Sequence, residues 1–241
     1  MGRVALFSTC MADFAAPGPA QAARDFLEAL GHEVVVPADQ SCCGQPALNS
    51  GYPREAARLM DAWVDTFSGF EHVVSVAGSC TAMLAHHGGE LVSADRRMPR
   101  LWEFSQFVVA QATTRDLGLH LNARVTYHDA CHMTRMLGER HTPRALLSLI
   151  DGLELVEMTD SDSCCGFGGT FSVKFPEVST AMADMKLQTI AAAGADAVVT
   201  SDPGCITHLA ARAIATGSHV RFLHLAEVAA MALPARQGVL S

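Results

Sequence analysis

The chain has 241 residues, of which 49% are apolar, so it can bury a sizeable core as one large or two small domains without disulfide bonds. Its formal net charge of −8 argues against a nucleic-acid-binding protein and against a polybasic membrane anchor. The sequence has no uncharged apolar run of about 18 residues, so we expect no membrane-spanning helix.

The first half alternates short apolar runs with amphipathic helices. Ala22, Phe26 and Leu30 have helical spacing, and Gly31 is placed to end that helix. In chain order we expect a strand at Val4–Ser8, a helix at Gln21–Leu30, a strand at Val34–Val36, a helix at Arg54–Phe67, a strand at Val73–Val76 and a helix at Phe104–Ala112. The densest basic group, around Arg96 and Arg100, is expected to lie in a solvated loop.

The second half repeats the first. The strands expected there are Val125–His128, Leu153–Glu157, Ala197–Thr200 and Val220–Leu223, and the helices are Arg144–Ile150, Thr180–Ala192 and Leu225–Ala232. Four cysteines fall in each half in the same order: Cys10, Cys42, Cys43 and Cys80, then Cys131, Cys164, Cys165 and Cys205. Because chance would rarely produce this order twice, we predict two modules, residues 1–120 and 121–241, with their boundary near residues 115–123.

This order of elements predicts an α/β fold, with two tandem parallel-sheet, Rossmann-like, cysteine-rich modules related by an approximate two-fold axis. Within each module the cysteines follow three successive strands. Right-handed crossovers bring the carboxyl ends of parallel strands to one edge of a sheet, where open α/β sheets bind ligands. The four sulfurs of each module should therefore converge, although they are about 70 residues apart along the chain.

Four converging thiolates suit zinc, copper(I) or an iron–sulfur cluster. The adjacent pairs Cys42-Cys43 and Cys164-Cys165 favour a multi-iron cluster, because zinc sites usually separate their paired cysteines by two to four residues. Three alternatives stay open at this point. The cysteines can bind zinc, the adjacent pairs can form disulfides used in thiol exchange, or the thiols can simply be buried as small apolar groups.

The N-terminal stretch resembles a weak signal peptide, since Arg3 precedes the apolar run Val4–Met11. Asp13 interrupts the apolar character, and the same opening pattern recurs inside the chain at Arg124–Cys131. We therefore expect a cytoplasmic protein. In a reducing compartment metal ligation or redox chemistry is a better use of eight cysteines than structural disulfides.

Three polar residues flank Cys131, namely His128, Asp129 and His132. They can relay protons, or they can tune a cluster and hold its loop by hydrogen bonding, and we favour the second role. We assign no catalytic residue. Four glycines, Gly44, Gly166, Gly168 and Gly169, are interpreted as positions where the backbone approaches a bound cluster. The stretch from Cys165 to Gly169 lacks the Gly-Lys-Ser/Thr ending of a phosphate-binding loop.

The cysteine arrangement C…CCG…C, present twice, resembles the CCG cysteine-rich domain of heterodisulfide reductase and of the glycolate oxidase iron–sulfur subunit. The resemblance is greatest to the lactate-utilization protein A family, and it covers nearly the whole chain. The motifs that carry it are FSTC at Phe7–Cys10, CCGQP at Cys42–Pro46, GSC at Gly78–Cys80, HDACH at His128–His132, CCGFGG at Cys164–Gly169 and DPGC at Asp202–Cys205.

The resemblance implies an electron-transfer subunit of a multi-component system that oxidises L-lactate to pyruvate. It implies one or two iron–sulfur clusters, with [4Fe-4S] the expected type and the eight cysteines as ligands. The implied partners are other lactate-utilization subunits, including a ferredoxin-like iron–sulfur protein, so the chain would be a redox subunit of an oxidoreductase complex and not a self-sufficient enzyme. The alternatives are a heterodisulfide-reductase-like disulfide or thiol reductase subunit and a non-redox zinc protein.

The sequence departs from the heterodisulfide reductase pattern at the end of each module. That pattern ends in C-x-x-C and supplies a fifth cysteine. Here Cys80 is followed three residues later by Met83, and Cys205 by His208. His208 is a candidate extra ligand, because histidine can bind iron, and the alternative is a helix histidine packed beneath the loop. Met83 is expected to belong to the core.

Overall fold

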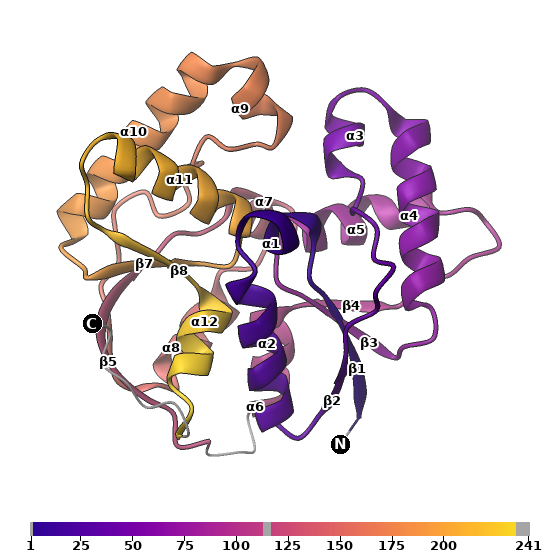
Figure 1. The fold of residues 1–241 in the computed structure, drawn as a ribbon, viewed down its shortest axis with the longest axis horizontal. Coiled ribbons are helices and arrows are strands. Elements are labelled where there is room, and N and C mark those ends of the chain that lie inside the picture. Colours follow the sequence, from indigo (N-terminus) through magenta and orange to yellow (C-terminus); the bar gives the residue numbers. More distant parts are fainter. Residues whose placement is uncertain (1, 113–116, 235–241) are drawn as a thin grey trace.

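The computed structural model describes residues 2–112 and 117–234. The first module contains a four-stranded parallel sheet with strand order β2-β1-β3-β4 (Figure 1). Its strands are β1 (Arg3–Phe7), β2 (Glu33–Val35), β3 (His72–Ser75) and β4 (Arg100–Glu103). Its helices are α1 (Cys10–Ala15), α2 (Gly18–Ala29), α3 (Gln45–Asn49), α4 (Pro53–Phe67), α5 (Gly78–Leu91) and α6 (Phe104–Ala112).

The second module repeats this arrangement, with a four-stranded parallel sheet of order β6-β5-β7-β8. Its strands are β5 (His120–Tyr127), β6 (Asp151–Leu155), β7 (Ala197–Thr200) and β8 (Arg221–His224). Its helices are α7 (Cys131–Arg135), α8 (His141–Ser148), α9 (Thr170–Lys174), α10 (Pro176–Ala193), α11 (Pro203–Ala215) and α12 (Leu225–Met231). The predicted fold class, α/β with two parallel-sheet modules, is confirmed.

One strand is absent from the sequence-based prediction. β4 begins at Arg100, so the prediction of a solvated loop is wrong at that residue, whose guanidinium stacks on Trp102 at 4.3 Å from the ring centroid. Arg96 pairs with Asp61 of α4. The predicted module boundary at residues 115–123 falls partly on 113–116, outside the described residues, and the division into 1–120 and 121–241 stays a prediction.

Alternate residues of β1 face different layers, as a strand buried on both sides requires. Val4 and Leu6 pack into the central apolar cluster of the protein, whereas Ala5 and Phe7 pack with Trp63 into a cluster on the outer face. The second sheet has the same two-sided burial, and its outer cluster includes residues of α10 and α11. Each sheet therefore lies between two layers of helices, an architecture typical of parallel sheets.

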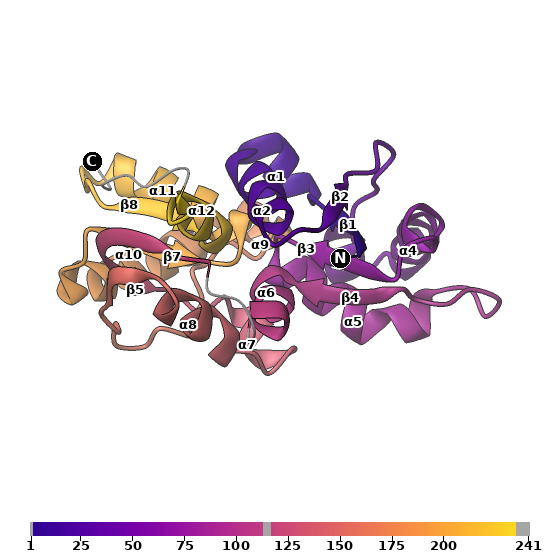
Figure 2. The same ribbon diagram turned by 90° about the horizontal axis from the view of Figure 1, so that it is seen from below.

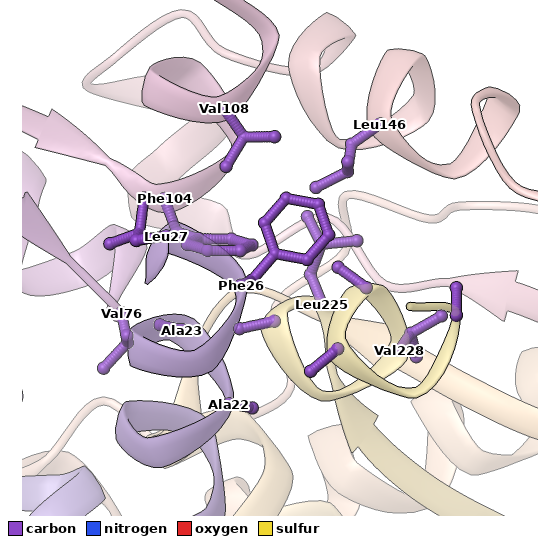
Figure 3. Close-up of a cluster of buried hydrophobic side chains, with 14 of the residues drawn as sticks. Ala22, Ala23, Phe26, Leu27, Val76, Phe104, Val108, Leu146, Leu225 and Val228 are labelled. Carbon is purple, nitrogen blue, oxygen red and sulfur yellow. The ribbon is translucent and has the colours of Figure 1, made fainter. Parts of the chain in front are cut away.

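The two modules share the central cluster, which contains residues of both sheets and of α2, α6, α8 and α12. Figure 2 shows α2, α6 and α12 between the sheet of the first module and that of the second. Phe26 of α2 and Phe104 of α6 pack there with Leu146 of α8 and with Leu225 and Val228 of α12 (Figure 3). α2 contacts α12, and α6 contacts α8. Since α2 and α6 correspond to α8 and α12 in the repeat, the equivalent helices exchange partners, as an approximate two-fold axis requires.

A polar seam continues the junction between the modules. The Gly78 amide donates to the Ser201 carbonyl at 2.9 Å, and the His224 Nε2 lies 2.7 Å from the Val76 carbonyl oxygen. Glu103 occupies the position in the first module that His224 occupies in the second, and both side chains are fully buried. These contacts hold the loops after β3 and β7 against each other, and these are the loops that lead to Cys80 and Cys205. Within the described residues no helix is long and apolar enough to cross a membrane.

Candidate metal centre

The loops after three strands of each sheet carry the cysteines to one edge. Cys10 is the first residue of α1, after β1, and Cys80 lies in the first turn of α5, after β3. Cys42 and Cys43 lie in the loop that follows β2 and end at Gly44, which precedes α3. The second module repeats this placement. Cys131 begins α7, Cys205 lies in the first turn of α11, and Cys164 and Cys165 precede Gly166.

Within each adjacent pair, the two cysteines lie close to cysteines from two different loops. Cys131 Sγ lies 3.8 Å from Cys164 Sγ, while Cys165 Sγ lies 3.0 Å from Cys205 Sγ. In the first module Cys10 Sγ lies 3.9 Å from Cys42 Sγ, and the neighbouring Cys42 and Cys80 thiols contribute to the raised pKa of Cys43. All eight thiols are free of disulfide bonds. We call Cys10, Cys42, Cys43 and Cys80 the first quartet, and Cys131, Cys164, Cys165 and Cys205 the second quartet.

Both quartets line a single cavity of about 160 Å³ between the modules. All eight cysteines contribute to its wall, together with Met11, Pro46, Phe167, His132 and Asp202. Because the two sheets present their carboxyl edges to the same space, the two predicted sites are neighbours and not separate pockets at opposite ends of the molecule.

The thiols in each quartet do not have equal acidity. Hydrogen bonds from the Cys10 and Cys43 thiols hold the pKa of Cys42 well below its ordinary value of 9.0, although burial opposes this. In the second quartet the Cys131 and Cys165 thiols lower the pKa of Cys164 in the same way. The lowered pKa favours the thiolate form at the first cysteine of each adjacent pair, and thiolates are the form that binds metals.

The spacing of the sulfurs bears on what the quartets can hold. In a tetrahedral zinc site with Zn–S bonds of about 2.3 Å, all four sulfurs lie about 3.8 Å from one another. Among the described residues, one group of three possible ligand atoms lies within 4.8 Å of one another. It consists of a ring nitrogen of His128 and the Sγ atoms of Cys165 and Cys205. Neither quartet brings three of its own sulfurs within that distance, so each is wider than a single zinc ion requires. Clustered soft thiols of this kind suit a bound metal ion or metal cluster.

The HDACH segment is held by a buried ion pair. The Asp129 carboxylate is 1% exposed. It accepts hydrogen bonds from both terminal nitrogens of Arg144, at 2.8 and 2.9 Å, and from the Ser161 hydroxyl at 2.7 Å. Burial would raise the pKa of Asp129, but the hydrogen bonds from Arg144 and Ser161 outweigh it and leave the pKa lowered. Asp129 thus positions the loop before Cys131 mainly through Arg144.

The histidines of this segment differ in their surroundings. His132 lines the cavity, and its Nδ1 lies 3.6 Å from Cys131 Sγ. His128 is fully buried, and burial lowers its pKa to about 4, so its ring is neutral at ordinary pH. The predicted extra ligand His208 directs its Nε2 to the Ser179 hydroxyl at 3.3 Å, and its role as a ligand stays a prediction.

The four glycines fall into two groups. Gly44 and Gly166 have φ of 85° and 92°, and a Cβ on Gly166 would lie 2.5 Å from the Ser179 carbonyl oxygen of α10. Both positions favour glycine because of their positive φ, and at Gly166 the Ser179 carbonyl oxygen also leaves no room for a Cβ atom. Gly168 and Gly169 line the cavity with the cysteines. Contact of any of the four with a bound group stays a prediction.

Two buried charged residues near the second quartet were given no role in the sequence analysis. Lys186 of α10 is 1% exposed and donates its Nζ to the carbonyl oxygens of Asp160 and Ser161, at 2.6 and 3.3 Å. Nothing in its helical pattern distinguished it from a surface lysine. Asp202 accepts the Gly204 amide at its own helix start and the Ser79 amide of the other module at 2.9 Å. Its place before Pro203 was a helix-capping signal that could have found it.

Comparisons with known proteins agree with the repeat. The CCG cysteine-rich domain family matches this chain twice, over residues 4–85 and 125–210, and each match contains one quartet. The chain is therefore a protein with two CCG cysteine-rich domains. Relatives that match nearly the whole chain identify the particular family within this class.

Lactate utilization protein A of Halalkalibacterium halodurans is 41% identical over 234 residues, which cover 94% of this chain and 96% of that protein. Lactate utilization protein A of Bacillus subtilis is 38% identical over 233 residues, which cover 94% and 98% of the two chains. The chain belongs to the lactate utilization protein A family. A hypothetical protein from Helicobacter pylori, a crystal structure, is similar at a TM-score of 0.59 and 12% identity over 96% of this chain and 49% of that chain, which shows the fold alone.

Proposed function

We propose that this chain is an iron–sulfur electron-transfer subunit of a multi-component system that oxidises L-lactate to pyruvate. The observation that carries the proposal is the meeting of both cysteine quartets in one cavity between the modules. Each quartet supplies four soft sulfur ligands, and [4Fe-4S] is the cluster type that we expect in each. A cluster bound there supplies one-electron transfer.

The electrons released by lactate oxidation indicate which step belongs to this chain and which belongs to its partner subunits. Oxidation of lactate to pyruvate releases two electrons and two protons, and the sequence carries no flavin or nicotinamide fingerprint that would accept a hydride. The relatives are named for lactate utilization. We therefore assign the oxidation of lactate itself to partner subunits, and to this chain the passage of electrons to or from a ferredoxin-like iron–sulfur partner.

The proposal is tested with the anaerobically purified, oxidised chain, the other lactate-utilization subunits and L-lactate. We expect the visible absorbance of the chain to bleach as electrons reach it, and the Cys164→Ser variant to bleach less. Lactate oxidation at an unchanged rate when this chain is left out would contradict the assignment.

A second candidate function is disulfide or thiol reduction by the same site. The observation that favours it is the cavity itself, in which the apolar side chains of Met11, Pro46 and Phe167 lie beside the two quartets and His132. A small disulfide substrate can enter such a space and lie between the two quartets. Turnover of a disulfide by the isolated, chemically reduced chain would support this function, and its absence with a disulfide series of varied size would exclude it.

A further inference from the structure

The second quartet has a buried nitrogen beside it that no hydrogen bond satisfies. His128 is fully buried, and its Nδ1 lies 3.2 Å from the Ser161 carbonyl oxygen, while its Nε2 has no hydrogen-bond partner. A neutral imidazole donates from one nitrogen and accepts at the other. With the Nδ1 hydrogen directed to Ser161, the Nε2 lone pair is free, and buried polar atoms are rarely left in that state.

This ring lies against two thiols of the quartet. A ring nitrogen of His128 lies within 4.8 Å of the sulfurs of Cys165 and Cys205, which are themselves 3.0 Å apart. Nδ1 is engaged by Ser161, so Nε2 is the nitrogen left for a ligand. The three atoms come from the loops after β5, β6 and β7, the three strand ends that build this site.

The ring is also held in place as a metal-binding histidine usually is, by a partner on its other nitrogen. The Ser161 carbonyl that faces Nδ1 also accepts the Asp129 amide at 3.0 Å and the Lys186 Nζ at 3.3 Å. The His128 amide donates to the Val199 carbonyl at 2.9 Å, which fixes its backbone to β7. The ring therefore cannot easily turn away from the sulfurs.

The first module has no counterpart to this nitrogen. The repeat aligns Cys131 with Cys10, and it thereby aligns His128 with Phe7. Phe7 is fully buried and packs edge-on against Trp63 and Phe67, at ring-centroid distances of 5.7 and 5.6 Å. An apolar ring thus fills in one module the place that an imidazole fills in the other.

We propose that His128 Nε2 is a nitrogen ligand to the metal group held by the second quartet, a ligand that the first quartet lacks. The inference rests on the proposed function, in which that quartet holds an iron–sulfur cluster. It makes the two centres chemically unequal, because one has only sulfur ligands and the other has mixed sulfur and nitrogen ligands.

The test uses the full chain, labelled with ¹⁵N-histidine, purified anaerobically and reduced, with pulsed EPR to detect nitrogen coupled to the iron spins. Two backgrounds separate the centres, since Cys42→Ser breaks the first quartet and Cys164→Ser breaks the second. We expect a directly coupled histidine nitrogen in the Cys42→Ser protein and none in the Cys164→Ser protein. The reverse pattern, or no coupling in either, would overturn the inference.

Variants of the histidines identify the ligand. In the Cys42→Ser background, His128→Phe and His128→Gln should both lose the coupling, and His128→Cys should retain iron without it. His128→Gln keeps the test valid if His128→Phe disturbs folding. His132→Ala and His208→Ala serve as controls and should keep the coupling. A coupling that survives both His128 variants, or that disappears in either control, would overturn the assignment.

Failure of the proposed function can be told apart from failure of this inference. Iron without a coupled nitrogen overturns the ligand and leaves the electron-transfer proposal standing. Zinc without iron overturns the electron-transfer proposal, and X-ray absorption at the zinc edge then decides the ligand. Loss of a nitrogen neighbour in His128→Phe would support the ligand, and an unchanged zinc environment would overturn it. A chain with no metal would overturn both.

Discussion

The carboxyl group of Glu103 makes the stability of the protein depend on pH. Glu103 ends β4 at the junction between the modules and is fully buried. Burial raises its pKa from 4.5 to about 7, although hydrogen bonds from the Ser105 amide, at 2.7 Å, and hydroxyl oppose the rise. The folded protein therefore keeps a proton on Glu103 at pH values where the unfolded chain has lost it.

The sign and size of the effect follow from this difference. Between pH 4.5 and about 7 the folded state binds more protons than the unfolded state, so the free energy of unfolding falls as pH rises, and this contribution is flat above the folded pKa. At about 1.4 kcal/mol per pKa unit, the loss across that window is about 3 kcal/mol. Glu103→Gln keeps an oxygen acceptor for Ser105 and has no charge to bury, so it should not suffer this loss.

Urea unfolding of the wild type and of Glu103→Gln, compared at about pH 5 and about pH 8.5, measures the effect. We expect the stability of the variant relative to the wild type to improve by about 2 to 3 kcal/mol between those pH values. Comparison at the same pH cancels the titration of His128 and His224, whose pKa values burial lowers to about 4. Glu90→Gln, at an exposed position, should show no such change. A difference between Glu103→Gln and wild type that stays constant with pH would refute the reasoning.

Three further outcomes follow from the structure. Asp129→Ala removes the hydrogen bonds from Arg144 and Ser161, while Arg144 keeps its ion pair with Glu157, so it should lower the free energy of unfolding by about 1 to 3 kcal/mol, measured by urea unfolding. Phe26→Ala opens a cavity in the shared core and should cost about 3 to 5 kcal/mol, with hydrogen exchange rising in both modules, whereas faster exchange confined to the first module would mean that the core is not shared. Cys164→Ser should remove more iron than Met83→Ala, measured per chain after anaerobic purification, and equal iron contents would contradict the ligand assignment.

The repeat allowed much of the fold to be predicted from sequence. Three strands per module and the convergence of their loops follow from the position of each cysteine after an apolar run. β4 was missed because its four residues begin with Arg100 and end with Glu103, and neither residue resembles a buried strand. Only the structure shows that Glu103 is covered by the opposite module.

The site was predicted less completely than the fold. The spacing of the cysteines indicated two quartets but carried no information on how the two sheets face each other, so the common cavity could not be foreseen. The HDACH motif drew attention to His128 as a residue near a cluster. The direction of its ring depends on the Ser161 carbonyl, 33 residues further along the chain, which sequence spacing does not reveal. Lys186 was hidden in the same way by a contact made only in the folded chain.

The most direct test of the account is the content of iron, acid-labile sulfide and zinc in the full chain purified without oxygen. We predict a brown protein in which iron and sulfide are both present in several equivalents per chain and zinc is nearly absent. Zinc in a colourless protein, or a chain that binds no metal at all, would contradict the claim that the two quartets hold redox clusters.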